Sequence, residues 1–401
     1  MEVRFFSRHL FGSCPPRARA EYEAIAARLH VPEGRPYFVA DDGLPDEELD
    51  GFCQYLTDPQ RPSPNTWKTY AYQLAVYLRW LRAQGKHWKE VTRDDLDTYY
   101  KVRTSEEFQT GIAIQGRSWN IAKTALVHFY EYARDKSLIV DLPFGYRSHK
   151  AYIGGHVVQV ADISAKATKN QLNFISVHNY KVLWRPQLSR GQNTQRNLAL
   201  VDLLITSGLR ISEALNLKVH EVPDADALEY IGLKSVTVSV MGKGKKRRKV
   251  RIPKRIVRAI RFYIDDARAE IVDRHCKQIP TEVFLSRKGR PLSERTVEEL
   301  FERVSAATGV KLIPHGCRHT FAIYQLDAMI KRMASNLKLL REKGTDAYRQ
   351  ILSDPLRELQ RLLGHSHVTT TYIYLDFLEE SEALVDDSLG EWTNWSNENG
   401  R

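Results

Sequence analysis

Hydrophobic residues recur at steps of three and four in the N-terminal third of the chain, the spacing of an amphipathic helix. The longest such run covers residues 65–83, and Ser63-Pro64 just before it is a helix start signal. Its apolar positions are Trp67, Tyr70, Leu74, Tyr77, Leu78 and Leu81. Shorter runs predict helices over 93–100 and 118–134, without strand-like alternation between them. Residues 45–145 are therefore predicted to form a small helical bundle with its aromatic side chains in the core.

Prolines and glycines divide the chain on both sides of this bundle. The first 44 residues are expected to be irregular because prolines occur at positions 15, 16, 32 and 36, and 21–29 reads as a short helix. Pro143, Gly145 and Gly154-Gly155 end the helical pattern on the other side, so residues 146–171 are predicted to be a linker. A second domain is expected to begin at about residue 172.

The second half of the chain mixes helical and strand-like patterns. Residues 196–217 read as a helix, a turn at Gly208 and a second helix, because glycine is the usual residue just past a helix end. Between 235 and 253, valines alternate with polar residues around a glycine-containing turn, which predicts a β-hairpin. A further helix is predicted over 293–307. The fold class is thus mainly α with a small β-sheet or hairpin (α+β).

Composition narrows the classes of protein that fit this pattern. A chain of 401 residues with 42% hydrophobic residues is long enough to bury the cores of two or three domains. Its formal net charge of +11 favours a polyanionic partner. No apolar run is long enough for a transmembrane helix, and the N-terminus does not resemble a signal peptide. The four cysteines are scattered, which is typical of reduced thiols rather than disulfides or a zinc site.

The turn and return strand of the predicted hairpin concentrate positive charge. Basic side chains occupy Lys243, Lys245, Lys246, Arg247, Arg248, Lys249 and Arg251. Such a run is often a solvated patch or a localisation signal, but a disordered tail would lack the alternating valines beside it. A hairpin turn of this kind can reach a phosphate backbone and supply salt-dependent affinity.

Arg210 stands at the predicted start of a helix, within the string T-S-G-L-R-I-S-E-A-L, and Glu213 follows three residues later. Backbone amides at a helix N-terminus favour anions, and a guanidinium there adds a second contact to a phosphate. The alternative is a surface arginine that pairs with Glu213.

A second arginine lies in the string H-G-C-R-H-T-F-A. His315 and Arg318 are three residues apart and share one face of a helix, where an imidazole and a guanidinium can converge on one phosphate. His315 and His319 also have the i, i+4 spacing of zinc ligands, but the usual glutamate between them is missing and no third ligand is evident. The sequence therefore favours a phosphate site, with His319 as a structural hydrogen-bonding group.

The string L-G-H-S-H-V-T-T-T-Y-I-Y places His365 nine residues before Tyr374. Tyr372 is a rival phenol, and residues two apart on a helix point about 200° from each other, so one of the two tyrosines can face a site. A phenol that joins two guanidinium groups, a lysine and histidines is a nucleophile suited to phosphoryl transfer.

Together these strings resemble the motifs of the tyrosine recombinase (phage integrase) family. The resemblance implies cleavage of a DNA strand by a tyrosine that becomes joined to a 3′-phosphate, followed by rejoining, without a metal or other cofactor. The catalytic residues that it implies are Arg210, Lys243, His315, Arg318, His365 and Tyr374, with Glu213 and His319 in support.

The family also implies a role for each of these side chains. The two arginines bind the scissile phosphate, Lys243 protonates the leaving 5′-oxygen, and the spacing from His365 makes Tyr374 the nucleophile. His315 assists removal of the tyrosine proton, and His365 donates a hydrogen bond to the phosphate. Lys245 and Lys246 lie near enough to Lys243 to leave the identity of the acid open. The implied DNA contacts of the hairpin are Lys245, Lys246, Arg247, Arg248 and Lys249.

A domain order follows from the same resemblance. Residues 45–145 become a helical core-binding domain for DNA, and 172–380 become a mixed α/β catalytic domain. The extension 1–44 is either a DNA-binding arm or a solvated segment. The tail, 381–401, follows a helix whose apolar face packs either on its own domain or on an adjacent protomer of a cyclic tetramer.

The spacing departs from the family pattern after the second arginine. Arg318 and His365 lie 47 positions apart, about twice the separation that the resemblance implies. We interpret residues 328–354 as a helical insertion with Gly344 at its turn. The insertion contacts either DNA or a neighbouring subunit.

The expected partners are double-stranded DNA and further copies of the chain, with a tetramer on DNA and a monomer or weak dimer without it. Other recombinases or accessory proteins are also expected, and no membrane; the expected location is the bacterial cytoplasm, at the nucleoid during reaction.

Two alternatives to site-specific recombination (integration, excision or transposition) stay open. A type IB-like topoisomerase uses a similar residue set, and a non-catalytic DNA-binding accessory protein of a mobile element could share the scaffold. The helical N-terminal domain and the tail favour recombination over the first, and the full residue set favours it over the second.

Overall fold

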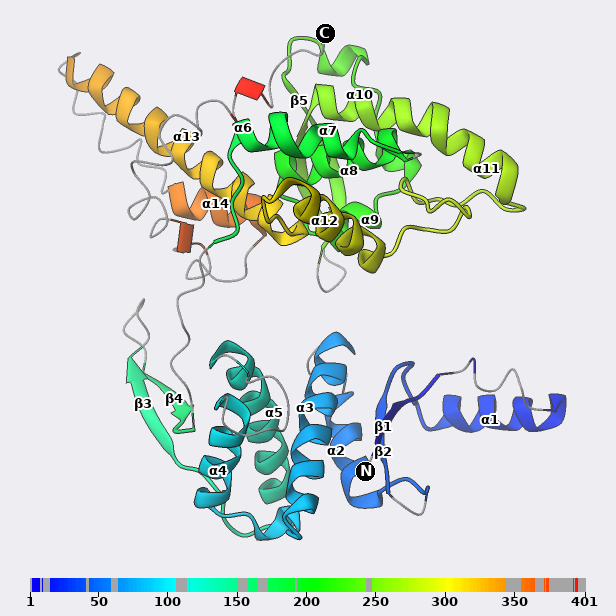
Figure 1. The fold of residues 1–401 in the computed structure, drawn as a ribbon, viewed down its shortest axis with the longest axis vertical. Coiled ribbons are helices and arrows are strands. Elements are labelled where there is room, and N and C mark those ends of the chain that lie inside the picture. Colours follow the sequence, from blue (N-terminus) through cyan, green and yellow to red (C-terminus); the bar gives the residue numbers. More distant parts are fainter. Residues whose placement is uncertain are drawn as a thin grey trace. The chain divides into compact units, whose positions relative to one another are not determined.

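The computed structural model describes residues 2–7, 9, 15–40, 43–58, 64–105, 114, 116–150, 157–163, 172–191, 193–242, 247–342, 355–364, 371, 373–374, 392 and 394–395. The chain divides into two compact units, Met1–Asn170 and Gln171–Arg401, each with its own hydrophobic core (Figure 1). Helices predominate and the described strands pair in small antiparallel sheets, which confirms the predicted fold class. None of the helices in the described part of the chain is both long and apolar enough to cross a bilayer.

The N-terminal unit contains the predicted helical bundle. Its elements are β1 (Glu2–Phe5), α1 (Pro16–Arg28), β2 (Pro36–Val39), α2 (Glu47–Leu56), α3 (Pro64–Ala83), a 3₁₀ turn (Trp88–Glu90), α4 (Arg93–Thr104), α5 (Gly116–Asp135), β3 (Tyr146–Lys150) and β4 (Val157–Ala161). Two of the bundle helices start at side-chain caps: Asp46 accepts from the Leu49 backbone N–H at 3.0 Å at the start of α2, and Asp95 accepts from the Thr92 backbone N–H at 2.7 Å at the start of α4.

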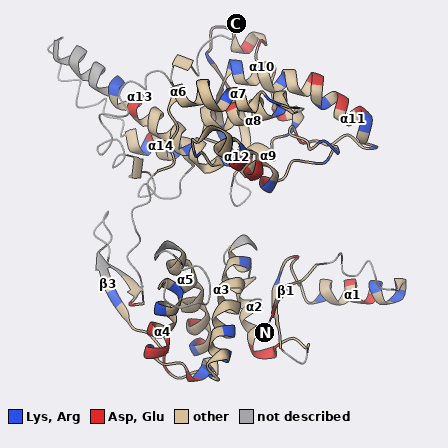
Figure 2. Ribbon diagram, in the orientation of Figure 1, with Lys and Arg blue, Asp and Glu red and all other residues tan. Residues whose placement is uncertain are grey.

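Aromatic rings fill the core of this bundle, as the sequence predicted. The buried hydroxyls of Tyr77 on α3 and Tyr130 on α5 share a hydrogen bond of 2.8 Å, and the Tyr130 hydroxyl donates to the Trp88 carbonyl at 3.1 Å. The indole N–H of Trp119 donates to the Ile163 carbonyl at 2.8 Å. Partners of this kind let large rings with polar tips lie in an apolar core. Lysine and arginine residues lie along α3 and α5 (Figure 2).

Two short antiparallel pairs lie where we expected an irregular extension and a linker. β1 pairs with β2, and Phe38 of β2 is fully buried in the bundle core. β3 pairs with β4, and Ala161 and Ile163 belong to the same core. Strands of four or five residues provide too few alternating positions to stand out in a sequence. Parts of both segments therefore fold with the N-terminal unit.

The C-terminal unit is built around one buried helix. Its elements are α6 (Val177–Asn179), a π-helical turn (Tyr180–Trp184), α7 (Arg185–Leu188), α8 (Thr194–Ser207), α9 (Ile211–Leu215), 3₁₀ turns (Val219–Glu221 and Leu228–Tyr230), β5 (Ser235–Met241), β6 (Arg247–Pro253), α10 (Lys254–Tyr263), a second π-helical turn (Ile264–Arg268), α11 (Ala269–His275), α12 (Glu294–Thr308), α13 (Pro314–Glu342) and α14 (Pro355–Leu363). Nearly every residue of α8 is buried, and the helix packs against α10, α13 and β6. This position makes α8 the scaffold for the elements that follow it.

The predicted helix–turn–helix is present and depends on Gly208. This glycine ends α8 in the left-handed conformation, with φ of 62°. A Cβ atom there would lie 2.3 Å from the ring of Phe321 on α13, so the close packing of α13 also requires glycine. The turn delivers Arg210 to the first position before α9.

The predicted hairpin is also present. β5 and β6 pair antiparallel, with Val238 opposite Val250 and Val240 opposite Arg248. Val236, Val238, Val240, Val250 and Ile252 are buried and join the core of the unit. The inward face of the hairpin thereby holds its strands against α8 and α10.

The helix that carries Arg318 is long. α13 runs for 29 residues, well past Arg318, and covers the start of the predicted insertion, whereas Gly344 lies outside the described residues.

Near the C-terminus, Trp392 and Trp395 are buried in the core of this same unit. The Trp392 indole N–H donates to the Ile175 carbonyl at 3.1 Å, so this part of the tail packs on its own unit.

Candidate active site

Arg210 lies where the chain leaves the Gly208 turn and enters α9. Glu213, one turn further on, accepts hydrogen bonds from the Arg210 backbone N–H at 2.8 Å and from its Nη1 at 3.1 Å. The carboxylate therefore fixes both the backbone and the side chain of this arginine. The Arg210 side chain remains 31% exposed, which leaves part of the guanidinium accessible to a ligand.

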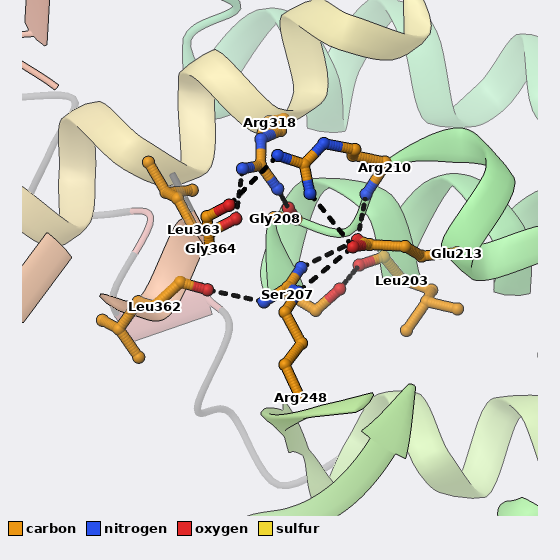
Figure 3. A network of polar contacts seen from close by, with 10 residues as sticks. All are labelled: Leu203, Ser207, Gly208, Arg210, Glu213, Arg248, Arg318, Leu362, Leu363 and Gly364. Carbon is orange, nitrogen blue, oxygen red and sulfur yellow. Dashed lines mark hydrogen bonds and ion pairs between the residues drawn. The ribbon is translucent and has the colours of Figure 1, made fainter. Parts of the chain in front are cut away.

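Arg318 approaches from α13 and is almost completely buried, with 1% exposure. Its Nη1 donates to the Gly208 carbonyl at 2.6 Å, and its Nη2 donates to the Leu363 carbonyl. Because Gly208 ends α8 and Leu363 ends α14, one guanidinium joins three helices. The sequence prediction that Arg210 and Arg318 converge agrees with this arrangement, since both guanidinium groups reach the end of α14 (Figure 3).

Three arginines contact three consecutive carbonyls at the end of α14 (Figure 3). Arg248 donates to Leu362 at 2.6 Å, Arg318 donates to Leu363, and Arg210 donates to Gly364 at 3.3 Å. The last carbonyls of a helix have no partner within the helix and carry the negative end of its dipole. Positive side chains therefore stabilise this end, and it in turn orients their guanidinium groups.

The charges in this network do not cancel, because it holds three guanidinium groups and one carboxylate, that of Glu213, which Arg210 and Arg248 contact (Figure 3). Burial lowers the pKa of Arg318 to about 10, and the positive charges of Arg210 and Arg248 act in the same direction. Burial alone would raise the pKa of Glu213, but hydrogen bonds and charge from Arg248, and then from Arg210, hold that pKa below its usual value. The excess positive charge suits the developing negative charge of a phosphoryl-transfer transition state.

Tyr374 lies within reach of this charge. Its side chain is 1% exposed, and its hydroxyl shares a hydrogen bond of 3.1 Å with Nδ1 of His319. Burial raises the pKa of Tyr374 to about 12, against the opposing influence of the positive charges of Arg318 and Arg210. The structure thus brings together the phenol and both arginines that the sequence singled out.

The two histidines of α13 lie one turn apart, as their spacing predicts. Their rings meet edge to face, with centroids 4.5 Å apart. The His319 ring faces Tyr374, with centroids 5.6 Å apart. We expected His315 in that position and His319 as a supporting residue, and the i, i+4 pattern alone could not distinguish them.

Several predicted site residues lie outside the described part of the chain. They are Lys243, Lys245, Lys246, His365 and the rival phenol Tyr372. Of the other basic hairpin residues, Arg247 is exposed and pairs with Glu221 at 3.7 Å, and Lys249 is exposed on β6. Arg248 differs from our expectation of a DNA-phosphate contact, because its side chain turns inward to Glu213 and Leu362.

Asn173 is a supporting residue that sequence reasoning missed. Its Oδ1 accepts a hydrogen bond from the Ile313 backbone N–H at 3.0 Å, and its Nδ2 donates to the Lys311 carbonyl at 2.8 Å. It packs so closely on α13 that a Cβ atom at Gly316 would lie 1.9 Å from its Oδ1. Asn173 therefore fixes the start of the helix that carries both histidines and Arg318. No local signal marks it, because its partners lie about 140 positions away in the sequence.

Comparison with known proteins identifies the family. Residues 180–331 match the model of the phage integrase family, and residues 49–137 match the phage integrase N-terminal SAM-like domain. The tyrosine recombinase XerC of Halalkalibacterium halodurans is 32% identical over 333 residues, which cover 82% of this chain and 92% of that protein. The tyrosine recombinase XerD of Bifidobacterium longum is 27% identical over 337 residues, with 81% and 90% covered.

Solved structures share the fold. A XerH site-specific recombinase bound to a palindromic difH substrate, in a post-cleavage complex, superposes with a TM-score of 0.53 at 17% identity and 80% coverage of each chain. The Tn1549 transposon integrase in complex with circular intermediate DNA gives a TM-score of 0.51 at 17% identity, with 80% of this chain and 93% of that chain covered.

The fold and the site together define a class of enzyme whose active site combines a tyrosine with arginines. The chain belongs to the tyrosine recombinase (phage integrase) family, which confirms the resemblance of its motifs. It is a tyrosine recombinase, an enzyme of site-specific DNA recombination.

Proposed function

We propose that this chain cleaves and rejoins double-stranded DNA through a 3′-phosphotyrosyl bond formed on Tyr374. The observation that supports this most is a buried phenol hydrogen-bonded at 3.1 Å to His319, which directly follows Arg318 on α13, while the guanidinium groups of Arg318 and Arg210 meet at the end of α14. A phosphate held by Arg210 and Arg318 would present its phosphorus to that phenol. A nucleophile and cations gathered at one site suit phosphoryl transfer, in which positioning and electrostatic stabilisation supply most of the catalysis.

In the proposed cleavage step, the Tyr374 oxygen gives up its proton and forms a bond to phosphorus. The bond from phosphorus to the 5′-oxygen breaks, and Lys243 supplies the proton that this leaving oxygen needs. Arg210 and Arg318 stabilise the added negative charge on the non-bridging oxygens, and His365 donates a further hydrogen bond there. Atoms and charge balance without a metal or another cofactor.

We assign removal of the phenolic proton to the histidine pair of α13, with His319 as the first acceptor. Its Nδ1 lies 3.1 Å from the Tyr374 oxygen, a distance suitable for direct transfer when the ring carries its own proton on Nε2. His315 packs against the His319 ring on the same helix and supports it in accepting the proton. Such general base catalysis typically contributes about 10²- to 10⁴-fold to a rate.

Rejoining is the reverse reaction. A 5′-hydroxyl attacks the phosphotyrosyl phosphorus and gives its proton to Lys243, while the bond to the Tyr374 oxygen breaks and that oxygen takes its proton back from His319. The covalent bond conserves the energy of the phosphodiester, so no nucleotide hydrolysis is needed. Attack by the 5′-hydroxyl of a second duplex exchanges strands.

The proposed partner is double-stranded DNA with the recombination site of a mobile or chromosomal element. The net charge of +11 supports it, as do relatives whose structures are described as DNA complexes. We further propose a tetramer on DNA, a monomer or weak dimer without it, joint action with other recombinases or accessory proteins, and a cytoplasmic location at the nucleoid. The arm 1–44 and the insertion 328–354 are proposed as further contacts, with DNA or a neighbouring subunit.

A type IB-like topoisomerase would use the same cleavage step, and the recombinase relatives do not favour it. The distinguishing experiment incubates the protein with two duplexes of different length that carry the repeats flanking its gene. Recombinant strands of exchanged length support the proposal. Relaxation of a supercoiled plasmid of unrelated sequence, without recombinant strands from the duplexes, would contradict it in favour of a topoisomerase. Binding to the duplexes without either reaction would indicate an accessory protein.

A further inference from the structure

Arg248 belongs to the basic run of the hairpin, but its side chain faces away from those of its neighbours. It stands directly opposite Val240 in the β5–β6 register, and residues opposite each other share one face of a sheet. Val240 is buried, and the Arg248 side chain is 15% exposed. Arg247 and Lys249 on either side are exposed. Arg248 therefore lies on the inner face of the hairpin.

All three nitrogens of the Arg248 guanidinium donate hydrogen bonds within the C-terminal unit. Nε donates to Oε1 of Glu213 at 3.1 Å and Nη2 donates to Oε2 at 2.8 Å, while Nη1 donates to the Leu362 carbonyl at 2.6 Å (Figure 3). A guanidinium that holds both oxygens of a carboxylate forms a strong and well-oriented ion pair. A side chain held in this way is not available to a DNA phosphate.

Arg248 and Arg210 share the same carboxylate. Each oxygen of Glu213 accepts one hydrogen bond from Arg248 and one from Arg210, through the Arg210 side chain at Oε1 and the Arg210 backbone at Oε2. The Arg210 side chain is about twice as exposed as that of Arg248, 31% against 15%. Arg248 is thus the inner counter-ion of Glu213, and Arg210 is the outer cation that faces the ligand.

We propose that Arg248 is a positioning residue, which neutralises Glu213 and ties β6 to the end of α14 so that the charge of Arg210 is left for the DNA phosphate. This inference rests on the proposed function, in which Arg210 binds the scissile phosphate. Without Arg248, Arg210 would be left to neutralise the buried carboxylate to which it is already hydrogen-bonded, and the negative charge of Glu213 would offset that of Arg210 where the phosphate binds. The loss would appear in the chemical step rather than in overall DNA affinity.

The first test compares Arg248→Ala with Lys249→Ala, an exposed neighbour on the same strand. Cleavage is followed in a single turnover on a nicked suicide duplex at saturating DNA, and binding is measured across a range of salt concentrations. Arg248→Ala should cleave about 100-fold more slowly, as expected for a displaced catalytic group, with wild-type affinity and salt dependence. Lys249→Ala instead removes an expected phosphate contact, so its salt slope should fall by about one.

The opposite pattern would overturn the proposal. If Arg248→Ala lowers the salt slope and cleaves normally at saturating DNA, Arg248 is a phosphate contact like its neighbours. If it matches the wild type in both measurements, Arg248 has no positioning role.

A double variant tests the charge argument itself. In Arg248→Ala combined with Glu213→Gln, the uncompensated carboxylate is gone, and the side-chain oxygen of the introduced glutamine can still accept from the Arg210 backbone. The double variant should therefore cleave faster than Arg248→Ala alone. Losses that simply multiply would show that Arg248 does not act by neutralising Glu213.

Two controls separate folding and the proposed function from this inference. If Arg248→Ala does not fold, as judged by thermal unfolding, Arg248→Lys keeps a charge without the two-point contact. That variant should bind DNA with the wild-type salt slope and cleave more slowly, and a reduced slope would again indicate a phosphate contact. A wild-type protein that forms no covalent adduct would refute the proposed function, whereas a normal Arg248→Ala beside an active wild type refutes only the role of Arg248.

Discussion

The hydroxyl of Tyr374 and Nδ1 of His319 lie 3.1 Å apart and share a hydrogen bond. His319 directly follows Arg318 on α13, so one helix supplies both a guanidinium of the charged network and the imidazole on the phenol. Burial raises the pKa of Tyr374 to about 12, and the nearby arginines oppose that rise without reversing it. The phenol is therefore neutral near pH 7, and its attack on phosphorus depends on a group that accepts its proton.

The first prediction concerns His319→Ala. Cleavage in a single turnover at saturating DNA should fall by about 100-fold or more, because the proton acceptor is lost. DNA affinity should stay unchanged, since His319 contacts the protein rather than a ligand phosphate in our proposal. His315→Ala is the matched control on the same face of α13, and its cleavage rate should fall by less. A larger loss in His315→Ala than in His319→Ala would return the role of proton acceptor to His315.

The pH dependence of the same variant gives a second prediction. A raised pKa means that the charged phenolate is disfavoured, and without an acceptor cleavage must draw on the small phenolate fraction. The rate of His319→Ala should therefore rise about tenfold per pH unit between about pH 7 and 9, well below the Tyr374 pKa of about 12. The wild type should show a shallower rise, because His319 takes the proton during the reaction. Parallel profiles would argue against His319.

The third prediction concerns Arg318→Lys. The ammonium of lysine cannot donate in two fixed directions, so it cannot bridge Gly208 and Leu363 and still face a phosphate. Cleavage should fall by about 10²- to 10³-fold, the usual cost of losing one preorganised donor at a transition state. The measurement is covalent complex formation on the suicide duplex, with a gel-shift assay to show that DNA binding persists. Retention of near wild-type cleavage would mean that Arg318 is a structural residue.

The fourth prediction tests the turn that places Arg210. Gly208→Ala introduces a Cβ atom 2.3 Å from the Phe321 ring and a side chain at φ of 62°. Strain and overpacking together should destabilise the C-terminal unit by about 2–4 kcal/mol, measured by urea unfolding of the full chain. Gly309→Ala is the control, because its φ is 70° but its Cβ atom would have no neighbour within 4 Å. It should cost about 1 kcal/mol from the backbone alone.

The fifth prediction tests the packing of the tail. Trp392 is fully buried, and its ring stacks on Tyr324 with centroids 6.0 Å apart. Trp392→Ala should destabilise the C-terminal unit by about 3–5 kcal/mol, as large-to-small core changes do. Trp392→Phe keeps a ring but loses the hydrogen bond to Ile175, and should cost less, about 1–2 kcal/mol. Equal stability of Trp392→Ala and the wild type would show that the tail does not pack on its own unit.

Much of the fold follows from periodicity in the sequence. The steps of three and four over 65–83 predicted α3 to within one residue at its start. A long apolar face at helical spacing is a strong signal, because only a helix places all of those side chains on one buried side. Valine alternation gave β5 and β6, and Gly208 gave the turn before Arg210. The short strands β1 and β2 did not stand out, because four residues are too few to establish a period of two.

The site was predictable in its residue types and less so in its contacts. The alternation that buries Val250 and Ile252 also turns Arg248 inward, but its place in a basic run hid that signal. Which histidine of α13 meets Tyr374 depends on how the helices pack, and the i, i+4 spacing leaves it open. The indoles of Trp392 and Trp395 lie three residues apart, a helical spacing that could have indicated a buried face.

The most direct test of the central claim is to locate the covalent bond to DNA. The wild-type protein is incubated with a suicide duplex, the adduct is digested with protease, and the nucleotide-bearing peptide is identified by mass spectrometry. We predict a single modified tyrosine, Tyr374, with no adduct in Tyr374→Phe and a normal adduct in Tyr372→Phe. An adduct that persists in Tyr374→Phe, or that maps to any other residue, would contradict the account.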